Sequence, residues 1–263
     1  MSRRCAARRR RKDLLGLLLI FATVLALGGV GAAAMLLRTP AFDAATLCLT
    51  AGPPPAHTLI LVDATDRLDV RHQRRLKAVA LEEAARLPRW GRLTVLSLRP
   101  DAENAPRELF SGCTAGDRLS ANPLWENVQT LEALKRERFD APLAAALSSA
   151  RGGRSADGSP IVEGLAAATA DPAFAGPGRR IVLVSDLLQF SPGRFSLYAP
   201  GATWARYQAA PGALRAAPDL TDVAVRVVTL ERKDEGPAQA VARQDFWAPY
   251  FDEAGAASVA WDR

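Results

Sequence analysis

The sequence predicts an α/β protein with a mostly parallel open sheet flanked by helices, preceded by one N-terminal transmembrane helix. Three observations predict this class. Residues 58–62 and 180–184 are short aliphatic runs that end in polar residues and a carboxylate, a profile typical of strands buried on both faces. An amphipathic helical pattern follows the first run. A long uncharged stretch follows a basic N-terminal tail.

The basic character of the chain is concentrated in its first residues. The net charge of the 263 residues is +6. The tail of residues 1–13 contains seven Arg and Lys residues and one acid, Asp13, so the remainder is close to neutral. The high isoelectric point therefore does not predict a face that binds nucleic acid.

Residues 14–37 predict a membrane anchor. They carry no charge and can cross a hydrocarbon core of about 30 Å as one helix. Because positively charged flanks stay in the cytoplasm, we expect a single pass through the inner (cytoplasmic) membrane, with the later residues in the periplasm or otherwise outside the cytoplasm. The alternative is a cleaved secretory signal, since residues 32–34 are all Ala and could be recognised by a protease. The length of the apolar run favours the retained anchor.

The positions of the cysteines are consistent with export of the later residues from the cytoplasm. Cys5 falls in the predicted cytoplasmic tail, whereas Cys48 and Cys113 are a possible pair in an oxidising compartment. The alternative is two unpaired buried thiols. No Cys and His residues have the spacing of a zinc site, and the two histidines, His57 and His72, offer little material for histidine-based catalysis.

The soluble part begins with a linker and a strand–helix–strand unit. Residues 38–56 are interpreted as the linker and residues 57–263 as one domain. The first strand is expected at 59–62, an amphipathic helix at 68–87 and the second strand at 93–98, an order that predicts parallel pairing with a right-handed crossover.

The later elements are predicted from the same patterns. Ser159 and Pro160 predict a helix start, because the hydroxyl can accept a hydrogen bond from a free backbone N–H. Two irregular segments, poor in periodicity, are interpreted as surface insertions. In order, we expect an insertion near 101–127, a helix at 131–147, a flexible break at 151–158, a helix at 161–170, a strand at 180–184, an insertion near 189–218, a strand at 223–230, a helix at 238–254 and a short edge strand at 258–261.

Polar residues gather where two of these strands end. Asp63 and Asp186 follow aliphatic runs, and they meet if their strands are neighbours in the sheet. Thr65 and Ser159 add hydroxyl oxygens on the same rim. Two carboxylates and two hydroxyls are a chemically sufficient ligand set for Mg²⁺ or Mn²⁺. The alternative is that the two Asp side chains only accept hydrogen bonds from loop amides.

These residues resemble the von Willebrand factor A (VWA) family, which has a Rossmann-like sheet with a metal-ion-dependent adhesion site at its carboxyl rim. Asp63 matches the first Asp of the family's Asp-x-Ser-x-Ser motif, and Thr65 replaces the first Ser. Ser159 resembles the Thr that opens a later helix, and Asp186 resembles the Asp after a later strand. Arg67 departs from the motif, because it stands where the family has its second Ser and cannot ligate a cation.

The resemblance implies a binding module that presents a metal, or the remnant of a metal site, to an acidic group of a protein partner. We therefore expect a membrane-anchored, non-enzymatic module that binds or scaffolds a protein. The alternative is a metal-dependent hydrolase of the phosphoesterase kind that uses Asp63 and Asp186. Against it, the chain has no second Asp two residues after Asp63 and no Gly-rich phosphate loop.

Overall fold

The structure, a computed structural model, describes residues 2–36, 40–98, 106–122, 126–150 and 158–262. The chain divides into two compact units, Met1–Ala41 and Phe42–Arg263. The flexible break expected at 151–158 lies almost entirely outside the described residues.

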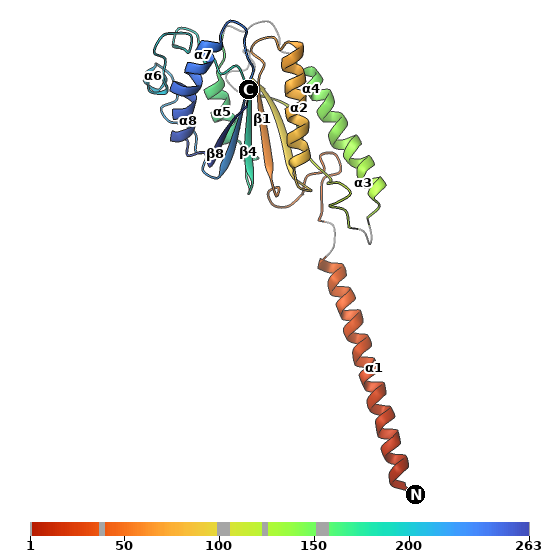
Figure 1. The fold of residues 1–263 in the computed structure, drawn as a ribbon. Coiled ribbons are helices and arrows are strands. Elements are labelled where there is room, and N and C mark those ends of the chain that lie inside the picture. Colours follow the sequence, from red (N-terminus) through yellow and green to blue (C-terminus); the bar gives the residue numbers. More distant parts are fainter. Residues whose placement is uncertain (1, 37–39, 99–105, 123–125, 151–157, 263) are drawn as a thin grey trace. The chain divides into compact units, whose positions relative to one another are not determined.

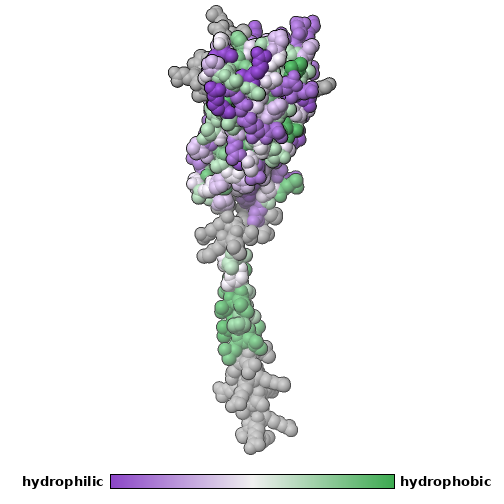
Figure 2. Space-filling view, turned by 90° about the vertical axis from the view of Figure 1, so that its left-hand side faces the viewer, coloured by the Kyte–Doolittle hydropathy of each residue, from purple (hydrophilic) through white to green (hydrophobic). Residues whose placement is uncertain are grey.

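The first unit is the helix α1, Ser2–Leu36. Its segment Gly16–Ala33 has a mean hydropathy of 2.2, and it is long and apolar enough to cross a membrane. Large apolar side chains along this segment, including Leu17, Phe21 and Val30, are each more than half exposed, and Figure 2 shows the apolar surface of this helix. A helix that is apolar all round needs an apolar environment, which a bilayer supplies.

The second unit is built on a six-stranded sheet in the order β3-β2-β1-β4-β7-β8 (Figure 1). All neighbouring pairs are parallel except β2 with β3. This is the strand order of doubly wound Rossmann-like sheets, so the predicted fold class is confirmed. The strands are β1 His57–Asp63, β2 Arg92–Leu98, β3 Arg107–Cys113, β4 Arg179–Ser185, β7 Val223–Thr229 and β8 Ser258–Asp262.

Helices cover both faces of the sheet (Figure 1). One face packs against α2 and α4 around Ile60, Val62 and Phe139. The other packs against α5 and the C-terminal helices around Leu61, Leu183 and the aromatic residues of the closing helix. Because both faces are covered, β1 is buried along its whole length. The helices are α2 Val70–Arg86, α3 Val128–Lys135, α4 Ala141–Ser149, α5 Ile161–Ala170, α6 Trp204–Ala209, α7 Gly236–Val241 and α8 Ala248–Glu253.

Both expected insertions contain regular structure. Inside the segment 101–127, β3 forms an antiparallel edge strand, which the sequence pattern did not reveal because Arg107, Glu108 and Gly112 obscure its alternation. Inside 189–218 lie a short hairpin, β5 Phe190–Ser191 with β6 Phe195–Ser196, and the helix α6. The α6 side chains Trp204 and Tyr207 are buried in the core, so this segment is part of the domain's packing.

The predicted linker also contributes to the folded unit. Within residues 38–56, Leu47 is fully buried beside Ala115, and the carbonyl of Thr46 accepts from the N–H of Cys113 at 2.8 Å. Cys48 and Cys113 form a disulfide, as the oxidising environment expected from the N-terminal segment allows.

Two of the long helices contain a π-helical turn. The turn η1, Arg136–Asp140, joins α3 to α4, and η2, Ala242–Trp247, joins α7 to α8. Each is followed two residues later by a proline, Pro142 and Pro249. Proline cannot donate to the carbonyl four residues before it and its ring collides with that carbonyl. A widened turn accommodates this clash without ending the helix.

Candidate functional site at the carboxyl rim

The site lies where the strand order reverses. After β1 the chain adds β2 on one side and later β4 on the other, so β1 and β4 are parallel neighbours at the switch point. Open α/β sheets bind ligands in the crevice beyond the carboxyl ends of such strands. Asp63 is the last residue of β1, and Asp186 directly follows β4. The condition under which the two Asp residues were expected to meet, that their strands are neighbours in the sheet, is therefore fulfilled.

Asp63 is buried and fully hydrogen bonded. Its Oδ1 accepts from the hydroxyl of Thr65 at 2.6 Å and from the Thr65 backbone N–H at 3.2 Å. Its Oδ2 accepts from the hydroxyls of Ser159 at 3.0 Å and Ser185 at 2.9 Å. Four donors stabilise this carboxylate, which is only 6% exposed. Thr65 and Ser159 therefore lie beside Asp63, on the rim where the sequence analysis expects them.

Ser159 does not cap α5, contrary to the expectation from Ser159 and Pro160. The residue at the cap position is Pro160, which has no side-chain cap hydrogen bond, and the Ser159 hydroxyl donates to Asp63 instead. The free N–H of Val162 in the first turn donates to the side-chain oxygen of Gln189 at 3.0 Å. A residue of the loop after β4 thus completes the start of α5.

Asp186 is held by the Arg232 side chain. Its Oδ1 accepts from the N–H of Leu188 at 2.9 Å, and its Oδ2 lies 2.5 Å from Nε of Arg232. Burial, and next the negative charge of Asp63, raise the pKa of Asp186 to about 7. The guanidinium opposes this rise, because an adjacent cation favours the ionised carboxylate. The contact with Arg232 therefore stabilises the ionised form of Asp186.

Arg232 also pairs with Asp66, so that one guanidinium bridges two carboxylates of the rim. Arg67 is exposed and lines the same cavity of about 400 Å³ as Asp63, Asp186 and Arg232. The rim therefore combines a buried acidic pair with two cationic side chains that the chain itself supplies.

The oxygen atoms at the rim suit a divalent ion, but the charges do not. Hydroxyl and carboxylate oxygens converge on Asp63, the ligand type that Mg²⁺ and Mn²⁺ prefer. Asp186, however, is already paired with Arg232, and Arg67 adds a second positive charge to the cavity. Among the described residues, no three His, Cys, Asp or Glu side chains form a cluster that could hold a metal. As arranged, these residues do not fit a resident divalent ion.

Two rim residues were missed from the sequence. Ser185 precedes Asp186 at the end of β4, and its place at a strand end was a usable signal. Arg232 follows β7 within a run of charged residues, which resembles an ordinary solvated surface. The contact of Arg232 with Asp186 depends on the pairing of β7 with β4, and no local sequence pattern predicts which strands pair.

No protein-family model and no curated protein matches the chain. Among solved structures, it is similar to an aerotolerance-related membrane protein from Bacteroides fragilis NCTC 9343, with a TM-score of 0.35 and 11% identity over 79% of this chain and 92% of that one. It is also similar to the human COPII-coat protein Sec24c, with a TM-score of 0.33 and 13% identity over 80% of this chain and 30% of that one.

Proposed function

We propose that the chain is a membrane-anchored, VWA-like module that binds or scaffolds another protein on the extracytoplasmic side and catalyses no reaction. The observation that carries the proposal is the meeting of Asp63 and Asp186 at the switch point of the sheet, beside the exposed Arg67. This is the place where open α/β sheets bind ligands. The apolar segment Gly16–Ala33 supports the membrane attachment.

The hydrogen bonds at the rim favour binding over hydrolysis. A nucleophile or general base needs a carboxylate oxygen within reach of the substrate. Both oxygens of Asp63 already accept from hydroxyl groups, and those of Asp186 face Leu188 and Arg232. Hydrolysis of a panel of phosphoesters by the wild-type chain, abolished by Asp63→Asn, would favour the hydrolase alternative.

We further propose that binding at the rim does not require Mg²⁺ or Mn²⁺, because Arg232 supplies a positive charge beside Asp186. In this proposal Arg232 neutralises Asp186, and the rim presents the exposed cation Arg67 to the partner. A metal-dependent module would instead lose its partner when divalent ions are removed.

Affinity capture from detergent-solubilised membranes tests both proposals. The wild-type chain should capture the same protein with and without a chelator. Arg67→Glu, which reverses an exposed charge at the rim, should reduce capture at least about fivefold. The matched control is Arg136→Glu, an exposed arginine of η1, which packs near β3 at the opposite edge of the sheet from β8.

The two proposals fail in different ways. Loss of capture on chelation alone would contradict the metal-free mechanism but keep the binding module. Equal capture by wild type and Arg67→Glu would contradict the rim as the binding surface.

A further inference from the structure

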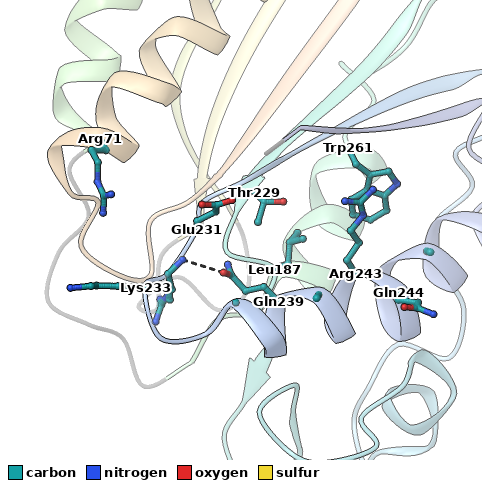
Figure 3. A pocket seen from close by; sticks show the side chains of 13 residues that line it. Arg71, Leu187, Thr229, Glu231, Lys233, Gln239, Arg243, Gln244 and Trp261 are labelled. Carbon is teal, nitrogen blue, oxygen red and sulfur yellow. Dashed lines mark hydrogen bonds between the residues drawn. The ribbon is translucent and has the colours of Figure 1, made fainter.

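A second cavity, of about 1010 Å³, lies beside the rim, between the end of β7 and the C-terminal helices. Figure 3 shows it from close by. Ala240, Ala248 and Trp261 contribute apolar surface, and Gln239 joins this cavity to the rim. The Gln239 amide donates to the carbonyls of Asp186 and Leu230 and accepts from the backbone N–H of Arg232.

The charged residues that line this cavity are mainly basic. They are Arg71, Arg232, Lys233 and Arg243, against one acid, Glu231. Arg232 is occupied by Asp66 and Asp186. In the part of the chain that the structure describes, no acidic side chain forms a salt bridge with Lys233 or Arg243. The cavity therefore holds positive charge that the fold does not neutralise.

These charges are spread across the cavity. Arg71 and Lys233 lie on one side, and Arg243 lies on the other, over the ring of Trp261 at 4.6 Å (Figure 3). The side chain of Arg71 is 82% exposed even though it contacts Asp69. A small anion such as phosphate is best held by cations that converge on one point. Separated cations with apolar surface between them are complementary to a chain that carries several carboxylates.

We propose that this cavity binds an acidic segment of a partner protein, with carboxylates toward Lys233 and Arg243 and apolar groups against Ala240 and Trp261. The proposal rests on the proposed function as a protein-binding module and names the chemistry of the partner. Its site is separate from Asp63 and Arg67, so the two surfaces can be tested independently.

The test uses the full-length chain in nanodiscs of neutral lipid and a short fluorescein-labelled peptide of alternating Glu and Ala, with binding followed by fluorescence anisotropy. Saturable binding is expected, and added salt should weaken it because screening acts on exposed charges. Lys233→Glu and Arg243→Glu should each raise Kd by about tenfold, since each replaces an attraction by a repulsion. Arg136→Glu, the same charge reversal at a distant site, should leave Kd unchanged.

Several outcomes would overturn the proposal. A peptide with Gln in place of Glu should not bind, and equal binding of the two peptides would contradict a site for carboxylates. Displacement by inorganic phosphate at the concentration of the peptide's Kd would indicate a small-anion site instead. Variants that bind as tightly as wild type would show that the peptide binds elsewhere. Arg67→Glu should retain peptide binding, so failure of the rim and failure of this cavity are distinguishable.

Discussion

Single residues in this domain differ sharply in how well their polar groups are satisfied. Glu163, in α5, accepts from the hydroxyl of Tyr207 at 2.8 Å and from the amide of Gln189 at 3.0 Å. Tyr250 is fully buried nearby, and its hydroxyl has no hydrogen-bond partner among the described residues. Burial raises the pKa of both tyrosines, so both hydroxyls remain protonated at neutral pH.

This contrast predicts different effects of the same substitution on the free energy of unfolding. Tyr207→Phe should lower the free energy of unfolding by about 1–3 kcal/mol, because a hydrogen bond to a charged group is lost. Tyr250→Phe should leave it unchanged or raise it by up to about 1 kcal/mol, because an unpaired buried hydroxyl is removed. Urea unfolding of the detergent-solubilised chain measures both. A larger loss for Tyr250→Phe than for Tyr207→Phe would contradict the assignment of these contacts.

The sequence predicted the residues of the rim better than their interactions. Asp63 and Asp186 were found because a carboxylate at the end of a buried strand is a local signal. The role of Arg232 was not predicted, because its partner Asp186 lies 46 positions earlier in the chain (232 minus 186). The wrong expectation that Ser159 caps α5 has a similar cause, because the group that the Ser159 hydroxyl donates to, Asp63, comes from the distant strand β1.

At the scale of elements, one chain of hydrogen bonds crosses three strands at the amino end of the sheet. Arg92 of β2 donates to the hydroxyl of Ser111 in β3, which lies 3.3 Å from the hydroxyl of Thr94. Thr94 contacts Nε2 of His57 in β1 at 2.9 Å, and Nδ1 of His57 lies 3.0 Å from the carbonyl of Ala173. A carbonyl can only accept, so Nδ1 carries the proton and Nε2 accepts from Thr94.

This arrangement predicts a loss of stability in acid. Burial, and next the charge of Arg92, lower the pKa of His57 from 6.5 to about 4. Between these two values the unfolded chain takes up a proton that the folded chain does not. As pH falls from about 6.5 to about 4, the free energy of unfolding should therefore decrease, by up to about 3 kcal/mol from this residue.

Urea unfolding at neutral pH and near pH 4 measures this change. Carboxylates also titrate in the range, so the comparison is with His57→Gln, which should lose less stability on acidification than wild type. His72→Gln, which replaces the chain's other histidine in the same way, is the control for the substitution itself. Equal losses in wild type and His57→Gln would show that His57 does not carry the effect.

The elements themselves were predictable where the pattern was local. The strands β1, β2, β4 and β7 were identified because their aliphatic runs are buried by helices on both faces. The edge strand β3 was missed, since its exposed half carries Arg107 and Glu108 and only its second half is well buried. The helix α6 was missed because its six residues are too few to show a period.

At the scale of the whole molecule, the disulfide and the N-terminal segment make one combined prediction. The chain has three cysteines, and Cys5 lies outside the disulfide between Cys48 and Cys113. If the second unit leaves the cytoplasm, the disulfide forms in the cell. If the cells are quenched with acid to stop thiol exchange and the denatured chain is then treated directly with a maleimide-polymer, one label should bind before reduction, at Cys5.

After reduction, the same chain should bind three labels, one for each cysteine. Cys48→Ser should lower the free energy of unfolding of the oxidised protein by about 2–4 kcal/mol. Three labels before reduction would contradict the extracytoplasmic location. An alkaline phosphatase fused after residue 263 provides an independent check, because it is active only outside the cytoplasm.

The disulfide also determines where tension enters the folded unit. Cys113 lies opposite Arg92 in the pairing of β2 with β3, and Arg92 lies opposite His57 in the pairing of β1 with β2. A pulling force transmitted along the chain to Cys48 therefore divides between two routes, one along the backbone to β1 and one through the sulfur atoms to β3. The strand that ends in Asp63 bears only part of that load, and the edge of the sheet bears the rest.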